Sequence, residues 1–450
     1  MADNLEAEVS HEEPDTSTTE QYVSNNFVAL MFDQPSNLHQ IYCARQEYTA
    51  QAGPSTAGTA HGNFLKGVKW SPDGSCLLTA SDDNWLRIFD LPQNVLYANA
   101  HGDAHGDASS CQGTGSSSSS GQGGSSADSL SAALRIQEGE TIYDYAWYSR
   151  MTVTDAASCC FASSSRGHPI HLWDACAGSL RATYRGFNAV DEVAPAYSLC
   201  FSPDGQKLFA GYPKGIYVFD VNRPGRQYRK IETHKKHQDS VPGIISCMDF
   251  SPDGNTFAAG SYGKVVGLYD SRSHDLTLTL SGHTGGLTQV MFSKDGNYLY
   301  SGARQDPHIL CWDVRFNSGE VYRMARATAA TNQRVHFHVE PCGRHLATGG
   351  AGGAMKVFDL RTGTEVLELH CTDDTINGLE FHPYMPLIAT ASGQRQYPLQ
   401  PATDSDSDEE HVRAAAKPST PTQKNDVTNA LMIWKCDYQY LSSEPQSQVA

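Results

Sequence analysis

Short apolar runs alternate with polar turn sequences along most of the chain. A typical unit holds an apolar run such as Met248–Phe250, then a Ser-Pro-Asp-Gly turn at Ser251–Gly254, then a second apolar run. Pro presets φ, Asp bonds its own backbone and Gly takes positive φ, so this tetrapeptide favours a tight turn. Runs this short, separated by turn residues, predict β-strands. No long helical period interrupts them, so we expect an all-β protein.

Seven of these units end in an aromatic residue followed by an acid, or in a degraded form of that pair. The pairs close the segments Ile88–Asp90, Leu172–Asp174, Val218–Asp220, Leu268–Asp270, Cys311–Asp313, Val357–Asp359 and Ile433–Lys435. From Asp174 to Asp359 the acids follow one another at steps of 46, 50, 43 and 46 residues. That period is typical of WD repeats, in which each unit forms a four-stranded blade. The sequence therefore predicts a seven-bladed WD40 β-propeller over residues 27–440.

A propeller has to close, because an open sheet edge is liable to aggregate. The chain ends soon after Lys435, so blade seven lacks room for a strand after its third. We expect the segment 38–48, near the N-terminus, to supply a strand to blade seven.

Blade five carries the fullest repeat signature. His283, Ser301, Asp306 and Trp312 have the spacing of the hydrogen-bonded set that is buried in many WD blades. We therefore interpret His283 and Asp306 as structural and not catalytic.

The two tails contain polar, low-complexity sequence, and so do the two long intervals between repeat pairs, from Asp90 to Asp174 and from Asp359 to Lys435. Such composition predicts a disordered acidic tail at 1–26, flexible insertions at 98–129 and 399–427, and a C-terminal tail at 441–450. Within the second insertion, Ser405 and Ser407 precede acids and suit an acidophilic kinase, although a solvated spacer is the competing interpretation. The tract His101–Asp107 resembles a metal-binding sequence, but we interpret it as part of the low-complexity insertion.

The net charge of −17 is unevenly distributed. Residues 1–20 hold seven acids and residues 404–410 hold five, with no Lys or Arg in either segment, so the rest carries −5. A nearly neutral body leaves nucleic-acid binding open.

No catalytic or metal-binding motif stands out in the sequence. Nucleophile motifs, phosphate-binding loops and paired Cys-x-x-Cys spacings are missing, so we expect neither an enzyme nor a cofactor nor a metal site. His336 and His338 share one strand face, but no third ligand accompanies them. The twelve scattered cysteines suggest reduced thiols inside the cell. The sequence shows neither an apolar run of membrane-spanning length nor a secretory signal.

Cations and two tyrosines recur in the loops that follow the second strands or open the first strands of the blades. These loops share one rim, and their side chains could attract phosphates or stack on unpaired bases. The candidate RNA-binding residues are Lys66, Arg166, His168, Tyr212, Lys214, Tyr262, Lys264, Arg304, Arg334 and Arg395.

Several loop sequences resemble those of the telomerase Cajal body protein family, which are WD-repeat scaffolds. The resemblance rests on Asn63–Ser75, Glu138–Ser149, Ala162–Ala175, Gly260–Tyr269, Ser301–Arg315, Thr331–Arg334 and Thr390–Arg395. It implies a non-enzymatic RNA-binding protein of the nucleus that recognises the CAB box of small Cajal body RNA, and of telomerase RNA where present. The resemblance further implies transport of H/ACA ribonucleoproteins, including dyskerin, to Cajal bodies, some cytoplasmic presence, folding by the cytosolic chaperonin, and support of telomere maintenance.

Two other functions remain open on the residues alone. Trp312-Asp313-Val314-Arg315 fits the W-D-x-R sequence of substrate receptors of cullin-type ubiquitin ligases, although Arg after the acid also begins an ordinary strand connection. The acidic segments would suit a propeller that binds histones or basic peptides.

Overall fold

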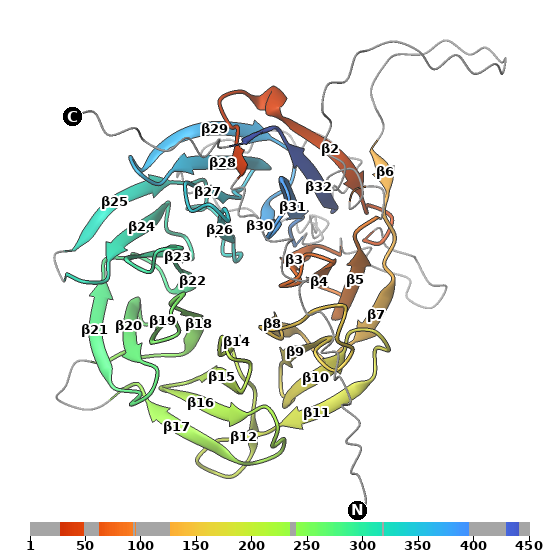
Figure 1. The fold of residues 1–450 in the computed structure, drawn as a ribbon. Helices are drawn as coiled ribbons and strands as arrows, with labels where there is room; N and C mark the ends of the chain where they lie inside the picture. The colour runs from red at the N-terminus through yellow and green to blue at the C-terminus, as the bar shows by residue number, and fades with distance from the viewer. Residues whose placement is uncertain are drawn as a thin grey trace, which may run out of the picture.

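The computed structural model describes residues 28–48, 63–92, 95, 127–234, 240–316, 319–395 and 429–440. Within them, seven sheets of four or five strands surround a central axis, as the repeat period predicts (Figure 1). The predicted tails, the 399–427 insertion with Ser405 and Ser407, the His101–Asp107 tract and most of the 98–129 insertion lie outside the described residues.

The first four blades each contain four antiparallel strands. Blade one has β3 (Leu65–Trp70), β4 (Cys76–Ser81), β5 (Trp85–Asp90) and β7 (Leu134–Gln137). Blade two has β8 (Ile142–Trp147), β9 (Cys160–Ser165), β10 (Ile170–Asp174) and β11 (Leu180–Tyr184). Blade three has β14 (Ser198–Phe201), β15 (Lys207–Tyr212), β16 (Gly215–Asp220) and β17 (Tyr228–Glu232). Blade four has β18 (Ile245–Phe250), β19 (Thr256–Ser261), β20 (Val265–Asp270) and β21 (Leu276–Ser281).

The remaining blades complete the ring. Blade five has β22 (Leu287–Phe292), β23 (Tyr298–Ala303), β24 (His308–Asp313) and β25 (Glu320–Ala325). Blade six has β26 (Phe337–Val339), β27 (His345–Thr348), β28 (Ala354–Asp359) and β29 (Thr364–His370). Blade seven has β30 (Ile376–Phe381), β31 (Leu387–Ser392), β32 (Leu431–Cys436), β2 (Leu38–Cys43) and β6 (Asp128–Ser129). A 3-10 turn, η1 (Pro35–Asn37), precedes β2, and two small ribbons pair β1 (Val28–Leu30) with β33 (Tyr438–Tyr440) and β12 (Gly186–Phe187) with β13 (Val193–Ala194).

The N-terminal segment closes the ring in blade seven, which confirms the expectation from the sequence. Strand β2 pairs antiparallel with β32, with Leu38 opposite Cys436 and Cys43 opposite Met432. On its other side β2 pairs parallel with β6, so the last two residues of the predicted 98–129 insertion form a strand. Strands from both ends of the chain therefore share one sheet.

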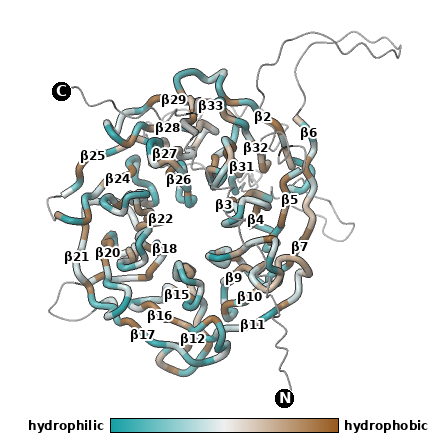
Figure 2. The backbone as a smooth tube through the Cα atoms, viewed as in Figure 1, coloured by the Kyte–Doolittle hydropathy of each residue, from teal (hydrophilic) through white to brown (hydrophobic). Residues whose placement is uncertain are grey.

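The hydrophobic core lies between neighbouring blades. Hydrophobic residues follow the strands, whereas the connecting loops are largely hydrophilic (Figure 2). Each cluster of buried side chains joins two or three sheets; one of them brings together Tyr42 of blade seven with Leu65 and Phe89 of blade one. Burial of such side chains stabilises the fold by about 1.5–3 kcal/mol each.

Side chains on the innermost strands bond the backbone of the next blade. Asp144 Oδ2 accepts a hydrogen bond from Leu199 N–H (2.8 Å), and Asp249 Oδ2 accepts one from Phe292 N–H (2.8 Å). Between blades seven and one, a carboxylate oxygen of Glu380 accepts the Trp70 N–H. These bonds connect blades near the axis, where the strands themselves do not pair.

The blade-five set is joined as its spacing predicts. His283 Nδ1 lies 2.9 Å from Asp306 Oδ2, and His283 Nε2 lies 2.7 Å from Ser301 Oγ. The indole N–H of Trp312 donates to the same Ser301 oxygen (2.7 Å). All four side chains are buried, so the set connects two strands, β23 and β24, with the two loops that carry His283 and Asp306.

Blade two contains a related set that the sequence interpretation missed. Glu138 takes the place of the acid, and its carboxylate bonds Ser163 and lies 3.1 Å from His171 Nδ1. Trp173 Nε1 donates to Ser163 Oγ at 2.8 Å. The signal was present, because His, Ser and Trp recur here on adjacent strands, but the acid precedes them in the chain instead of lying between Ser and Trp.

Replacing Asp306 with alanine should lower the free energy of unfolding by about 3 kcal/mol at neutral pH, because His283 loses its buried partner. Burial would raise the pKa of Asp306, but hydrogen bonds from His283 and the Thr284 N–H hold it well below its usual value. Because the pKa of Asp306 is lower in the folded than in the unfolded state, its carboxylate stabilises the fold above about pH 4. This stabilisation is lost as the pH falls further. Urea unfolding at pH 7, 5 and 3 measures the difference in free energy of unfolding between wild type and variant. This difference should decrease only below about pH 4. A difference that stays constant over this range would contradict the prediction.

Candidate nucleic-acid interface

A pocket of about 710 Å³ lies where one rim of the propeller meets the central axis. We call it the mouth pocket. Its lining residues include Lys66, Lys69, Tyr143, Tyr197, Tyr262, Arg304, Asn332, Gln333, Arg334, Gln394 and Arg395. They come from the loops after the second strands and before the first strands, which share one rim because adjacent strands are antiparallel.

Arg334 is the centre of this pocket. It lies just before β26, and its guanidinium donates to Tyr143 O (3.0 Å) in blade two and to Tyr262 Oη (3.1 Å) in blade four. A longer contact reaches Tyr197 O at 3.5 Å. One side chain from blade six therefore contacts three tyrosines that belong to blades two, three and four.

Tyr262 and Arg304 form a second contact in the pocket. The Arg304 guanidinium lies 5.4 Å from the centre of the Tyr262 ring and donates to its hydroxyl at 3.2 Å. Burial would raise the pKa of Tyr262, but the charges of Arg334 and Arg304 outweigh it and lower the pKa below its usual value. The phenol oxygen is thus an acceptor shared by two arginines, while its ring lines the pocket.

Two further tyrosines, which the sequence interpretation missed, stack beside them. The rings of Tyr143 and Tyr197 lie 5.0 Å apart with an angle of 14° between their planes. Each is only partly buried, and both line the mouth pocket. They come from the start of β8 and the residue before β14, and the sequence interpretation selected only cations, Lys66 and Arg334, from the segments that open first strands.

Two of the predicted cations in this pocket are paired with an acid. Lys66 Nζ lies 3.5 Å from Asp82 Oδ1, and Arg395 Nη2 lies 2.9 Å from the same oxygen. Burial lowers the pKa of Lys66, and Asp82 opposes that effect. Asp82 thus reduces the positive charge on this side of the pocket.

Tyr212 does not lie on the rim, so its prediction as a stacking residue is wrong. Strand β15 extends to Tyr212, and the side chain points into the core, where it is 1 % exposed. Its ring stacks on Tyr217 with 4.1 Å between centroids. The loop therefore begins one residue later than the sequence suggested.

The other predicted residues lie on this rim but outside the mouth pocket. Arg166, Lys214 and Lys264 are exposed at the tips of their turns, and the charge of Arg166 acts on Tyr143. His168 is partly buried, with its ring packed over Gly139. The structure thus places Lys66, Tyr262, Arg304, Arg334 and Arg395 together and leaves these four at the periphery.

Among the residues that the structure describes, two acceptor atoms at the pocket are buried without a hydrogen-bond partner. They are Gln333 Oε1 and Asn377 Oδ1. The amide nitrogen of Asn377 donates to Leu65 O (2.8 Å) and Gly393 O (2.6 Å), which fixes the orientation of the amide. Because buried polar atoms without partners are costly, both acceptors favour a ligand that carries N–H donors.

His336 and His338 both line the central channel, as their alternation on one strand predicts. Burial lowers the pKa of each to about 3, so both rings are neutral at pH 7. Glu380 lies 3.6 Å from His338. Over the described ranges, however, no cluster of three or more His, Cys, Asp or Glu side chains is suited to a metal ion.

Across the part of the chain that the structure covers, no helix has the length and apolar character needed to cross a membrane.

Comparison with known proteins identifies the relatives of this chain. Residues 54–90, 228–270 and 274–313 match the family "WD domain, G-beta repeat". The chain is 43 % identical to telomerase Cajal body protein 1 of Bos taurus over 78 % of its own length and 61 % of that protein. It is 32 % identical to the telomerase Cajal body protein 1 homolog of Drosophila melanogaster over 85 % of its length and 67 % of that protein. It is also 30 % identical to the guanine nucleotide-binding protein negative regulator 1 of Schizosaccharomyces pombe, over 74 % of the chain and 81 % of that protein.

The chain thus spans about 61 % of the length of the bovine relative, and the aligned part includes most of the propeller. With identities of 40–43 % to the mammalian proteins and 32 % to the insect homolog, we conclude that the chain is a member of the telomerase Cajal body protein 1 family.

Proposed function

We propose that this chain is a non-catalytic scaffold that binds single-stranded RNA through the mouth pocket. The observation that carries the proposal is the convergence of Tyr143, Tyr197 and Tyr262 on two arginines, Arg304 and Arg334, at one pocket. Aromatic rings stack on unpaired bases, and guanidinium groups bind phosphates and base edges. The two acceptors without partners, on Gln333 and Asn377, would meet the amino groups that bases carry.

Unpaired RNA fits this pocket better than duplex RNA. A volume of about 710 Å³ admits a few nucleotides or bases, whereas a helix would reach only the exposed cations around it. The exposed cations around the pocket would then attract the phosphate backbone of the RNA. They are Arg166, Lys214 and Lys264, with His168 beside them. This division retains all the predicted residues as contacts except Tyr212.

Membership of the family supports a more specific proposal for the RNA. The relatives are named for telomerase and the Cajal body. We infer that the ligand is the CAB-box loop of a small Cajal body RNA, or of telomerase RNA where the host has one. In that role the chain would work in the nucleus, in Cajal bodies, with a cytoplasmic fraction. It would assemble with H/ACA proteins including dyskerin, and the cytosolic chaperonin would fold it.

The ubiquitin-ligase alternative has less support. Arg315 of the W-D-x-R sequence pairs with Asp313 at 2.7 Å and lies 5.6 Å from the Phe316 ring. These local contacts account for the arginine without a partner protein.

The proposal predicts that a hairpin RNA with an unpaired loop binds more tightly than the same stem closed into a duplex. Tyr143→Ala and Tyr262→Ala should each weaken loop binding by about 5- to 150-fold, the loss expected for one stacking contact of ~1–3 kcal/mol. Fluorescence anisotropy on labelled RNA measures both effects.

Tyr212→Phe is the matched control, because it alters a tyrosine that the structure places in the core. It should leave RNA affinity unchanged. Equal affinity for loop and duplex, or full affinity in both alanine variants, would rule out the mouth pocket as the RNA site. Sequencing of RNA cross-linked to the protein in its own cells then tests the CAB-box proposal separately.

A further inference from the structure

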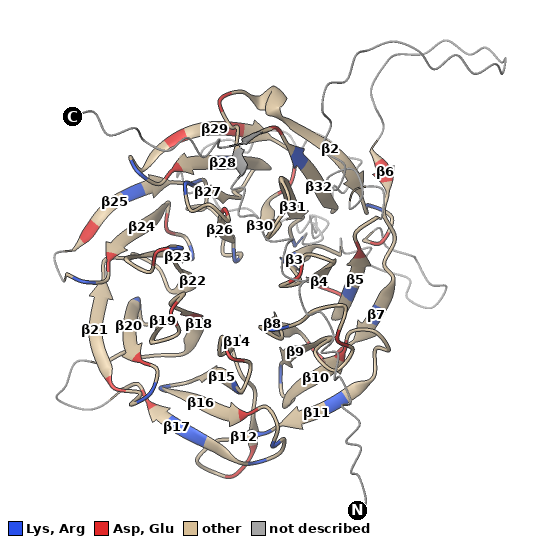
Figure 3. Cartoon of the chain, viewed as in Figure 1, with Lys and Arg blue, Asp and Glu red and all other residues tan. Residues whose placement is uncertain are grey.

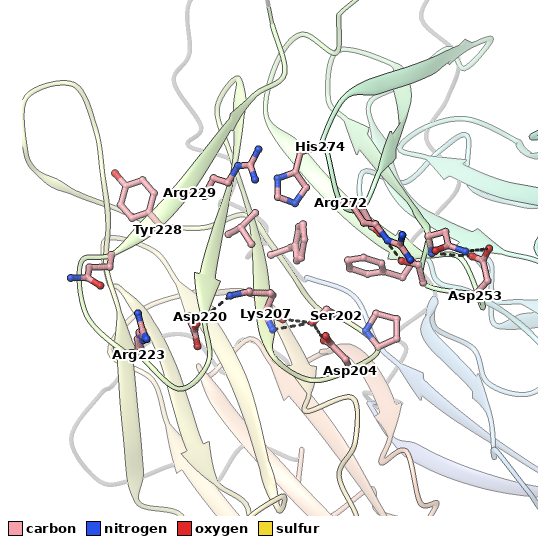
Figure 4. Close-up of a pocket in the computed structure, with 18 residues that line it drawn as sticks. Ser202, Asp204, Lys207, Asp220, Arg223, Tyr228, Arg229, Asp253, Arg272 and His274 are labelled. Atoms are coloured by element: carbon pink, nitrogen blue, oxygen red, sulfur yellow. Dashed lines mark hydrogen bonds and ion pairs between the residues drawn. The ribbon is translucent and has the colours of Figure 1, made fainter.

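A second groove, of about 810 Å³, opens between blades three and four, away from the central axis (Figure 4). We call it the inter-blade groove. It is lined by the turns after β14, β16, β18 and β20 and by residues of β15, β16 and β17. Turns between first and second strands, and between third and fourth strands, lie on the rim opposite the mouth pocket because adjacent strands are antiparallel. The two sites therefore face opposite sides of the propeller.

At this junction the residue that follows the innermost strand is small, so no ring from that position covers the groove. At two other blade junctions a large ring follows the innermost strand and reaches the turn glycine of the next blade. Tyr148 packs over Gly205 in this way, and His382 Nε2 bonds Gly74 O at 2.9 Å. At the junction of blades three and four the corresponding position is Ser202, and Pro203 approaches the turn glycine, Gly254, as Pro252 approaches Gly296 at the next junction.

The floor of the groove is aromatic. The rings of Phe209 and Phe250 pack edge to face with 5.0 Å between centroids, and Phe250 is only partly buried. Val218 and Tyr228 extend this apolar surface on the side of blade three. An aromatic or large aliphatic side chain of a ligand would find contacts here of the kind that anchor protein interfaces.

Basic side chains border this floor. Arg223, Arg229 and Arg272 are all exposed and line the groove from both blades. Arg229 Nη2 makes a long hydrogen bond to Ser273 O (3.3 Å), whereas no ion pair involves Arg223 or Arg272 in the described residues. Acids and bases are otherwise interspersed around the ring (Figure 3), so this grouping is local.

The acids of the groove are occupied by their own turns. Asp204 accepts from Ser202 Oγ and Gln206 N–H, and Asp253 accepts from Ser251 Oγ and Asn255 N–H. Asp220 pairs with Lys207 at 3.1 Å. The arginines are therefore the charged groups with remaining hydrogen-bonding capacity.

We propose that the inter-blade groove binds an acidic peptide segment of a partner protein, with an aromatic or large aliphatic side chain on Phe209 and Phe250 and carboxylates on Arg223, Arg229 and Arg272. A peptide can place separate carboxylates at the arginines and an apolar group between them. An RNA backbone carries a negative charge at each nucleotide, so its phosphates would be repelled by Asp204, Asp220 and Asp253. A partner in this groove leaves the mouth pocket accessible, so the propeller can connect two ligands on opposite rims.

The test uses fluorescence anisotropy with the full chain and a labelled acidic peptide that carries one central Phe among Asp and Glu residues. R223E/R272E should weaken binding of this peptide at least about tenfold, because each reversal replaces attraction by repulsion. R150E/R361E is the matched control, with the same charge change at two exposed arginines on the same rim in other blades. That variant should keep wild-type affinity. If the reversed variant does not fold, as judged by thermal unfolding, R223Q/R272Q replaces it.

Two altered peptides test the chemistry of the ligand. Replacing the central Phe by Ser, or all Asp and Glu by Asn and Gln, should each abolish most of the binding. The proposal is overturned if the wild-type protein does not bind the acidic peptide at low salt, or if both charge-reversal variants bind it alike. It is also overturned, in favour of an RNA site, if R223E/R272E weakens binding of hairpin RNA and leaves peptide binding intact. If R223E/R272E binds loop RNA with wild-type affinity, the inter-blade groove is distinct from the proposed RNA site.

Discussion

Replacing Arg334 with alanine should weaken RNA binding about 100-fold or more, the largest effect of any single change at the mouth pocket. The substitution removes a cation from the pocket and the donors that hold Tyr143 O and Tyr262 Oη. Loss of one charge-assisted contact costs about 1.5–3 kcal/mol, and release of the tyrosines adds the cost of ordering them again on binding. Anisotropy with a labelled loop RNA measures the affinity, and thermal unfolding measures the folded fraction.

Two variants separate charge from positioning. Arg334→Lys keeps the charge but cannot make both hydrogen bonds from a planar fork, so it should recover only part of the affinity. Tyr262→Phe keeps the stacking ring and removes the oxygen that Arg334 and Arg304 share, so its loss should be smaller than that of Arg334→Ala. If a folded Arg334→Ala protein binds loop RNA as tightly as wild type, Arg334 takes no part in recognition.

The fold could be predicted because its causes are local and repeated. Turns such as Ser251–Gly254 and the aromatic–acid pairs recur at one spacing, and each unit needs the next to bury its apolar faces. Closure by 38–48 could be predicted because an open edge of blade seven would be unfavourable. The pairing of Asp128 with Tyr42 could not be predicted in the same way, because two residues at the end of a Gly/Ser-rich stretch carry no strand pattern.

The candidate site was only half predictable, because a loop position says little about side-chain direction. Tyr212 and Tyr262 looked alike in the sequence, yet Tyr212 is the last residue of β15 and turns inward. Tyr143 and Tyr197 lie at the starts of strands, where the sequence pattern indicates that an aromatic residue is buried in the core.

The ion pairs and contacts of the cations could not be predicted from the sequence either. Asp82 neutralises Arg395 across 313 residues of sequence, a contact that only the closed ring creates. Arg334 could be recognised as a cation on the right rim, but not as the group that joins blades two, four and six.

Deleting residues 1–44 should prevent the propeller from folding. The deletion removes β1 and β2, and with them the buried side chains of Leu30, Phe32, Leu38 and Tyr42. At about 2–5 kcal/mol for each of these four side chains, the loss is about 8–20 kcal/mol, which is as large as the ~5–15 kcal/mol that stabilises an ordinary domain. The edge of β32 would also lose its partner, and an unpaired edge promotes aggregation. Size-exclusion chromatography and circular dichroism melts should show aggregated protein without a cooperative transition.

Deleting only residues 1–26 is the control, because it leaves every described residue in place. This shorter deletion should keep the melting temperature of the full chain. A synthetic peptide of residues 28–44, added during refolding of the longer deletion, should restore a cooperative melt, since it supplies both missing strands. A soluble 1–44 deletion that melts cooperatively without the peptide would mean that six blades and strands β30, β31 and β32 of blade seven are stable with the ring open.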